Sequence, residues 1–218
     1  MVFMEDSERA AKLALYENLE TGLHLNLVLP YDSPKVSEDM KRSHGSAIRF
    51  FQAGPWTQVI YNPFITRAVV SAFQSQLDEY RRLFGKDPVY FNGHKHFHLS
   101  LNMIIGNVLP PGLKVRRSFS IHKGEKSVLN RFYRSLIDAW LQKRYVTTDS
   151  FFSLSPVNDL ARLRKIARLA QTTNVELMTH PWSSDQFAFL TGDNFRNIFA
   201  EVRLGGFEAL KSSAMRSS

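Results

Sequence analysis

The chain has 218 residues, of which 44% are hydrophobic, so it is long enough for one domain with a sizeable core. It contains no cysteine, which excludes disulfides, thiolate zinc sites and cysteine nucleophiles. No apolar run is long enough to cross a membrane, and residues 1–6 have neither the basic nor the apolar part of a secretory signal. We therefore predict a cytoplasmic protein without a transmembrane segment.

The formal net charge of +8 raises the question of a nucleic-acid partner. The basic residues are spread along the chain, however, and most fall on the polar faces of predicted helices. No recognition motif for nucleic acid is visible. We interpret the charge as a solvated basic surface and predict that the protein has no nucleic-acid partner.

The sequence pattern in the first third of the chain predicts a helix, a strand and a long loop. Residues 1–21 have apolar positions at helical spacing, and residues 23–29 alternate apolar and polar side chains up to Pro30, which is typical of a strand. Residues 31–62 show no clear period and contain several glycines and prolines. We predict that this segment is a long loop or flap that shapes the substrate pocket.

The sequence pattern in the middle of the chain predicts a helix with a clear apolar period, followed by a strand. Residues 63–84 carry apolar side chains at helical spacing, with Asn62 as the cap before Pro63 and Gly85 as the terminator. The run at residues 89–91 is predicted to be a strand. It leads directly into a histidine-rich segment.

The same alternation continues downstream. We predict strands at residues 112–118 and 175–178, helices at 125–144 and from 155 onward, and a short last strand near 202–207. Alternating strands and helices indicate a parallel sheet with right-handed crossovers, and so an α/β fold. We expect one domain over residues 1–211 and a disordered, serine-rich tail over 212–218.

The histidines are the best candidates for chemistry. Five of the seven lie in or directly after predicted strands: His24, His94, His96, His98 and His180. The other two, His44 and His122, lie in polar surroundings and look incidental. Ligands bind at the carboxyl ends of parallel strands, so these histidines, at three positions on separate strands, should converge at one end of the sheet. Imidazole is a common metal ligand and the usual general acid or base.

Each histidine also has a structural explanation. A single histidine inside a strand, such as His24, is more often a satisfied core residue than a ligand. His94, His96 and His98 would share one face of an extended segment, although such runs also occur on surfaces without function. His180 could simply be a loop residue before a proline. The comparable placement on separate strands is what favours a metal site with open positions.

Several motifs occur in a fixed order over about residues 5–207. They are Gly22–Leu27 (GLHLNL), Phe84–Pro88 (FGKDP), Asn92–His98 (NGHKHFH), Lys114–Arg116 (KVR), Thr148–Phe151 (TDSF) and Glu176–Pro181 (ELMTHP). Together they resemble the motifs of the YdjC/ChbG-like carbohydrate deacetylases, which include hopanoid-biosynthesis deacetylases. The resemblance is specific because the motifs share the order and the spacing of that family.

The resemblance implies a distorted, incomplete (β/α) barrel of the glycoside hydrolase/deacetylase type. It also implies a divalent metal ion, Mg²⁺ or Zn²⁺, and removal of an N-acetyl group from an amino sugar or a chito-oligosaccharide-like substrate. A non-catalytic sugar-binding or interaction protein on the same scaffold is the alternative, and a homodimer is left open.

The positions of residues within these motifs indicate which of them correspond to site residues of the resembled family. The resemblance implies that His24 and His94 bind the metal, that His180 protonates the departing amine, and that Arg116 is a further catalytic group. It also implies that three residues contact the substrate: Asn26, His96 and His98.

Aromatic residues of the predicted loop are candidates for stacking on a sugar ring. Trp56 is the one we assign to substrate binding, with Phe50 and Phe51 beside it in the sequence. All three could equally be core residues.

The sequence departs from the resembled family in two places. That family has a first strand ending in Asp-Asp-x-Gly, which supplies a metal ligand and a base, whereas residues 1–21 resemble the helix that follows it. Asn92 stands where that family usually has aspartate, which keeps hydrogen bonding but loses charge. We expect weak or absent deacetylase activity from this chain, explained by a start codon assigned too late or by a truncated paralogue.

Overall fold

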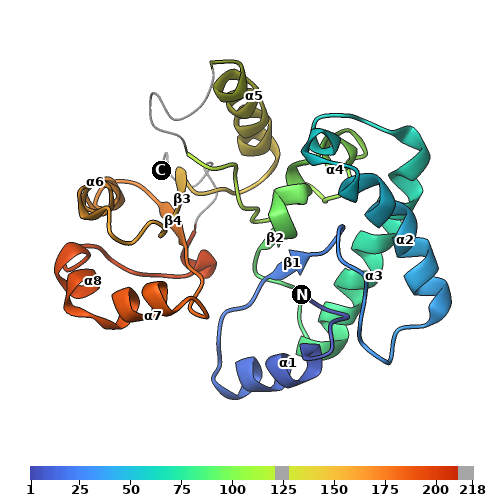
Figure 1. Cartoon of the computed structure of the whole chain (residues 1–218), viewed down its shortest axis with the longest axis horizontal. Coiled ribbons are helices and arrows are strands. Elements are labelled where there is room, and N and C mark those ends of the chain that lie inside the picture. Colours follow the sequence, from blue (N-terminus) through green and yellow to red (C-terminus); the bar gives the residue numbers. More distant parts are fainter. Residues whose placement is uncertain (121–127, 211–218) are drawn as a thin grey trace. The chain divides into compact units, whose positions relative to one another are not determined.

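The computed structural model describes the backbone of residues 1–120 and 128–210 and the side chains of 1–120 and 134–210. His122 and the predicted tail at 212–218 lie outside the described residues. The chain divides into two compact units, unit 1 (Met1–Val115) and unit 2 (Arg116–Ser218) (Figure 1). The single domain predicted over 1–211 stays a prediction.

Unit 1 combines helices with a pair of short strands. Its α-helices are α1 (Ser7–Tyr16), α2 (Glu38–Gln52), α3 (Thr66–Phe84) and α4 (Leu101–Ile105). Its strands are β1 (Leu23–Leu25) and β2 (Phe91–Gly93), and its 3₁₀ helices are η1 (Pro55–Gln58), η2 (Pro63–Ile65) and η3 (His94–Leu99). The two strands are parallel, and His24 pairs with Asn92.

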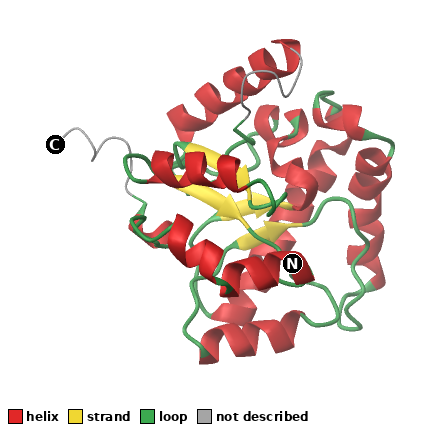
Figure 2. Cartoon of the chain, turned by 60° about the vertical axis from the view of Figure 1, so that its left-hand side comes forward, coloured by secondary structure: helices red, strands yellow, loops and turns green. Residues whose placement is uncertain are grey.

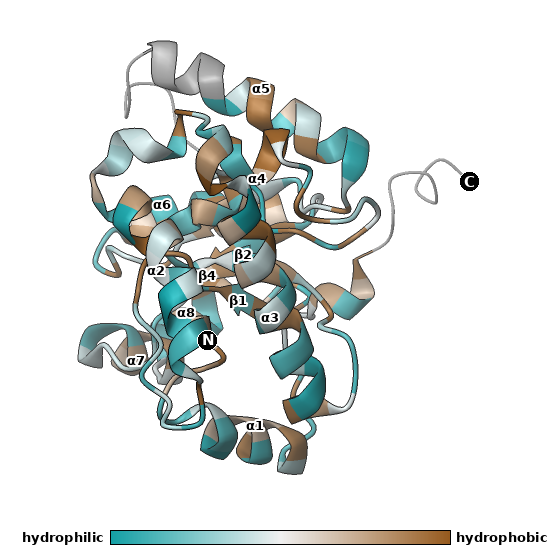
Figure 3. Cartoon of the chain, turned by 90° about the vertical axis from the view of Figure 1, so that its right-hand side faces the viewer, coloured by the Kyte–Doolittle hydropathy of each residue, from teal (hydrophilic) through white to brown (hydrophobic). Residues whose placement is uncertain are grey.

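The helix predicted over 63–84 is confirmed as η2 followed by α3. The Asn62 side chain accepts a hydrogen bond from the Phe64 amide, and Gly85 ends α3 with φ 66°, a left-handed conformation that suits glycine. Val69, Phe73 and other residues at helical spacing face the core. Hydrophilic residues cover much of the visible side of α3 (Figure 3).

The loop predicted over 31–62 is wrong, because the segment contains the helix α2 and the 3₁₀ helix η1. Ser37 caps this helix by accepting a hydrogen bond from the Met40 amide. Its buried residues are His44, Ala47 and Phe51, a narrow apolar stripe that the surrounding polar residues conceal in the sequence. His44 is only 3% exposed, so the expectation that it lies in polar surroundings is also wrong.

Unit 2 combines a second parallel pair of strands with its own helices. The helices are α5 (Val128–Arg144), α6 (Leu160–Ala170), α7 (Ser184–Thr191) and α8 (Asp193–Ile198), and the last turn is η4 (Phe207–Ala209). The strands are β3 (Ser150–Ser153) and β4 (Val175–Met178), with Ser150 paired to Val175. Figure 2 shows the strands as short arrows with helices packed beside them.

One core cluster of unit 2 joins a strand end to the helices that follow it. Phe152 and Leu154 come from β3 and its end, Leu163 and Ile166 from α6, and Phe199 from the end of α8. The parallel strands and their helices confirm the α/β class and the strand at 175–178. The barrel stays a prediction.

Two predicted strands are wrong. The segment at 112–118 forms only isolated bridge pairing, with Val115 opposite Phe91, and Ser120 then donates a hydrogen bond to the Phe151 carbonyl in unit 2 (2.8 Å). This change of partner prevents a continuous ladder. The segment at 202–207 pairs with no strand among the described residues. No helix in the described part of the chain is long and apolar enough to span a membrane.

Candidate functional site

His24 and His94 meet at the ends of the two strands of unit 1. His24 lies on β1, and His94 directly follows β2. Their ring centroids are 5.7 Å apart and the rings are nearly perpendicular, at 81°. Both side chains are half-buried. The pairing of β1 with β2 therefore brings together two residues that are 70 positions apart in the sequence.

Asn92 fixes the orientation of the His24 ring. His24 Nδ1 lies 2.6 Å from Asn92 Oδ1. An amide oxygen can only accept, so Nδ1 carries the hydrogen and donates it, and the lone pair of the neutral ring is on Nε2. This is the arrangement of a metal-binding histidine that a neighbouring oxygen holds in one tautomer. Asn92 therefore keeps the orienting role without the charge of an aspartate.

The pKa of His94 is lowered mainly by burial, and the positive charge of Lys95 adds to the effect. Both causes favour the neutral imidazole. Neutral imidazole is the form that binds metal ions.

The segment that carries the other histidines is a tight turn, not an extended strand. Lys95 (φ 49°) and His96 (φ 62°) are both left-handed within η3. The three histidines therefore do not share a face by strand alternation, which corrects the expectation for an extended segment. His98 is 2% exposed, and His96 is half-buried with its ring 6.1 Å from that of His98. Their contact with substrate stays a prediction.

Two features of the structure fix the conformation of this turn. A Cβ atom on Gly93 would lie 2.9 Å from the His98 backbone nitrogen, so only glycine fits there without a shift. The Gln58 side chain donates a hydrogen bond to the Lys95 carbonyl (3.0 Å). The turn after β2 is therefore tied to η1.

The histidine pair is only part of a metal site. Across residues 1–120 and the described part of 128–210, no three histidine, cysteine or acidic side chains are grouped so that they could hold an ion. His24 and His94 fit as two ligands of a divalent ion, but catalytic sites usually take three protein ligands.

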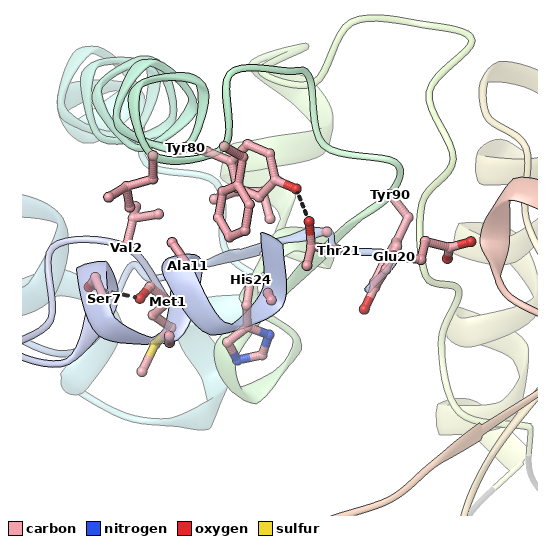
Figure 4. A pocket seen from close by; sticks show the side chains of 15 residues that line it. Met1, Val2, Ser7, Ala11, Glu20, Thr21, His24, Tyr80 and Tyr90 are labelled. Atoms are coloured by element: carbon pink, nitrogen blue, oxygen red, sulfur yellow. Dashed lines mark hydrogen bonds between the residues drawn. The ribbon is translucent and has the colours of Figure 1, made fainter. Parts of the chain in front are cut away.

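A hollow of about 290 Å³ opens beside His24 (Figure 4). Thr21, Gly22, Tyr80 and Tyr90 are among the residues that line it. The Thr21 and Tyr80 hydroxyls are hydrogen-bonded at 2.5 Å. A Cβ atom on Gly22 would lie 2.6 Å from the Tyr90 carbonyl oxygen, so this wall of the hollow requires glycine.

Asn26 has a structural role in this structure. It is fully buried, its Oδ1 accepts from the amides of Val28 (3.1 Å) and Leu29 (2.8 Å), and its Nδ2 donates to the Leu29 carbonyl (2.9 Å). These bonds turn the chain after Leu25, which is why β1 is shorter than predicted. The side chain is fully buried in this structure, and the expected contact between Asn26 and substrate stays a prediction.

We expect Asn26→Ala to lower the free energy of unfolding by about 2 kcal/mol, because the buried amide of Val28 and the partly buried amide of Leu29 lose their acceptor. Urea unfolding followed by circular dichroism measures the change. Asn197→Ala, at an exposed position on α8, should stay within about 0.5 kcal/mol of the parent. Unchanged stability of Asn26→Ala would contradict the structural role.

The three aromatic candidates divide by exposure. Phe51 is buried and contacts Phe97 (ring centroids 4.9 Å apart), so it is a core residue. Trp56 is 49% exposed and packs edge-on against Phe50 (6.3 Å). Trp56 lies on η1, the 3₁₀ helix that also carries Gln58. Because its side chain is exposed, Trp56 is the candidate that remains available to a ligand.

Arg116 is part of a mostly buried ion pair in unit 2. Its Nε lies 2.5 Å from Glu176 Oε1, and its guanidinium lies 4.8 Å from the centre of the Phe151 ring. Burial raises the pKa of Glu176, while the charge and hydrogen bond of Arg116 lower it. Glu176 was not among the predicted site residues. A single acid within the apolar run of β4 is the signal that could have identified it.

His180 follows β4 after Thr179, in a turn that also presents Trp182. The ring centroids of His180 and Trp182 are 4.6 Å apart, at an angle of 72°. Trp182 is 82% exposed and was not predicted as a site residue. The structure thus places His24 and His94 in unit 1, and Arg116 and His180 in unit 2.

Comparison with known proteins gives one match. The model of the YdjC-like protein family matches residues 1–218, the whole chain, and this family is associated with carbohydrate deacetylase-type function. Searches among curated proteins and among solved structures gave no match. The match over its full length shows that the chain belongs to the YdjC-like family.

Proposed function

We propose that this protein is a metal-dependent hydrolase that removes N-acetyl groups from a carbohydrate. The observation that supports the proposal most is the pair of imidazoles at the ends of β1 and β2, with His24 held by Asn92 in the tautomer of a metal ligand. The substrate class we propose is an amino sugar or a chito-oligosaccharide.

His24 and His94 would bind the ion, Mg²⁺ or Zn²⁺, as two of its ligands. The chemistry that such an ion supplies when bound is polarisation of the acetamide carbonyl. The described side chains contain no set of three that could hold the ion, so the proposal requires a further ligand and a base beyond the two histidines. This requirement fits the Asp-Asp-x-Gly motif that the sequence does not contain.

His180 is the proposed general acid. An amine is a poor leaving group unless it is protonated, and an imidazolium at a strand end can give it a proton. His180 is half-buried, and its amide donates to Gln186 Oε1 (2.8 Å), which fixes the backbone of the turn. The catalytic assignment of Arg116 is less favourable, because Glu176 neutralises its charge. We assign Arg116 to ordering the ends of β3 and β4.

The test is acetate release from N-acetylglucosamine oligosaccharides in the presence of Zn²⁺ or Mg²⁺. It uses the chain as printed and, if the upstream reading frame encodes Asp-Asp-x-Gly, the longer chain. We expect His24→Ala and His94→Ala to lower kcat/KM at least about 100-fold, and Asn92→Ala about 10-fold. Asn194→Ala, an exposed amide on α8, is the matched control and should leave kcat/KM unchanged.

No release of acetate by a chain that carries Asp-Asp-x-Gly, over a broad panel of sugars, would sink the deacetylase proposal. The second candidate is a sugar-binding protein without turnover. The incomplete set of metal ligands among the described residues favours it. That candidate predicts oligosaccharide binding that His24→Ala leaves intact, whereas a deacetylase loses turnover with the same substitution.

A further inference from the structure

Trp182 is the most exposed tryptophan of the described residues, with 82% of its surface accessible. It lies two residues after His180, in the turn that follows the carboxyl end of β4. Complete burial of a large apolar side chain stabilises the folded state by about 2–3 kcal/mol. The exposed indole of Trp182 does not contribute this stabilisation. An exposed indole at a strand end, where α/β proteins bind ligands, points to a binding function.

The turn that presents Trp182 is fixed on both sides. The Ser183 amide donates to the His180 carbonyl (2.9 Å), and the His180 amide donates to Gln186 Oε1 (2.8 Å). Gln186 is only 5% exposed, and its Nε2 donates to Ser155 Oγ (3.1 Å), just after β3. The indole therefore projects from a backbone that is already ordered, which lowers the entropy cost of binding a ligand.

The immediate surroundings of the indole suit a polyhydroxylated ligand. The His180 ring meets it edge-on at 4.6 Å. Ser183 and Asp185, which are hydrogen-bonded to each other, place a hydroxyl and a carboxylate in the same turn. One aromatic surface with a few polar groups beside it is a usual composition for a small-molecule site.

We propose that Trp182 is the platform on which a pyranose ring of the N-acetylated substrate stacks, so that the amide nitrogen of that sugar lies beside His180. The proposal rests on the proposed function, because it takes His180 as the acid. It adds a specificity-determining residue that binds substrate whether or not the chemical step proceeds.

The test is direct binding, which needs no turnover. The whole chain is titrated with the trimer of N-acetylglucosamine, and binding is measured by calorimetry. We expect Trp182→Ala to raise Kd at least 10-fold, and Trp182→Phe to restore part of the affinity because an aromatic face is kept. Phe187→Ala is the matched control, since Phe187 is an exposed aromatic residue (57%) on α7 without a histidine contact. Its Kd should stay within twofold of the parent.

The outcomes separate this proposal from the deacetylase proposal. An equal Kd for the parent and Trp182→Ala, or an equal loss in Phe187→Ala, would overturn the platform whatever the acetate assay shows. No binding by the parent would overturn it as well. A loss of affinity confined to Trp182→Ala, together with no acetate release by a chain that carries Asp-Asp-x-Gly, would keep the platform and remove the hydrolase.

Discussion

Replacing Arg116 with methionine is expected to lower the free energy of unfolding by about 3–5 kcal/mol. The substitution leaves Glu176 inside unit 2 without its counter-ion, and the Glu176 side chain is only 9% exposed. The cost arises because an unpaired carboxylate in a poorly hydrated site must either stay charged at high energy or take up a proton. Urea unfolding at pH 7 measures the loss.

The double variant Arg116→Met/Glu176→Leu should recover most of this stability, since replacing both members of a buried pair with apolar residues is often neutral. The matched control is Arg81→Met, which breaks an Arg–Asp pair of 2.7 Å that is exposed at Asp87 (72%). We expect that change to cost at most about 1 kcal/mol. Equal losses in Arg116→Met and Arg81→Met would contradict the buried character of the first pair.

The stability of unit 1 is expected to fall in mild acid because of His44. The ring is stacked on Tyr31 (centroids 4.0 Å apart), and Nε2 donates to the Leu29 carbonyl (3.1 Å). Burial lowers the pKa of His44 to about 4, and the bond to Leu29 offsets only part of this effect. The folded state therefore favours the neutral form of the His44 ring.

The pH window follows from the two pKa values, about 4 in the folded chain and 6.5 in the unfolded chain. Above pH 6.5 the ring is neutral in both states and its contribution is complete. As the pH falls towards 4, the unfolded chain binds the proton first, and the free energy of unfolding drops by about 3 kcal/mol in total. Urea unfolding from pH 7 to pH 4 measures the slope, and hydrogen exchange in α2 assigns it to unit 1.

His44→Phe should flatten this dependence, because it keeps an aromatic ring against Tyr31 and removes the titrating group. Tyr31→Phe is the matched control, since it keeps both the stack and His44 and should retain the slope. A slope that is the same in His44→Phe and in the parent would show that other groups cause the acid sensitivity.

Local sequence patterns were sufficient to predict the helices and strands that have a strong apolar period and clear end signals. The apolar period of residues 63–84, with Asn62 before it and Gly85 after it, predicts α3 because capping and helical spacing are local properties. The strand at 175–178 is likewise confirmed. By contrast, α2 was missed because only three buried positions mark its inner face, and packing against α3 rather than propensity makes it a helix.

The sequence by itself determined the family and the residue types of the site, because the ordered motifs depend on nothing but the chain. Tertiary structure alone decided which of those residues meet. Parallel pairing of β1 with β2 brings Asn92 to His24, and a left-handed turn at Lys95 removes the expected common face of the three histidines. Burial likewise gave Asn26 and Glu176 their partners, since contacts between distant residues are set by packing rather than by local pattern.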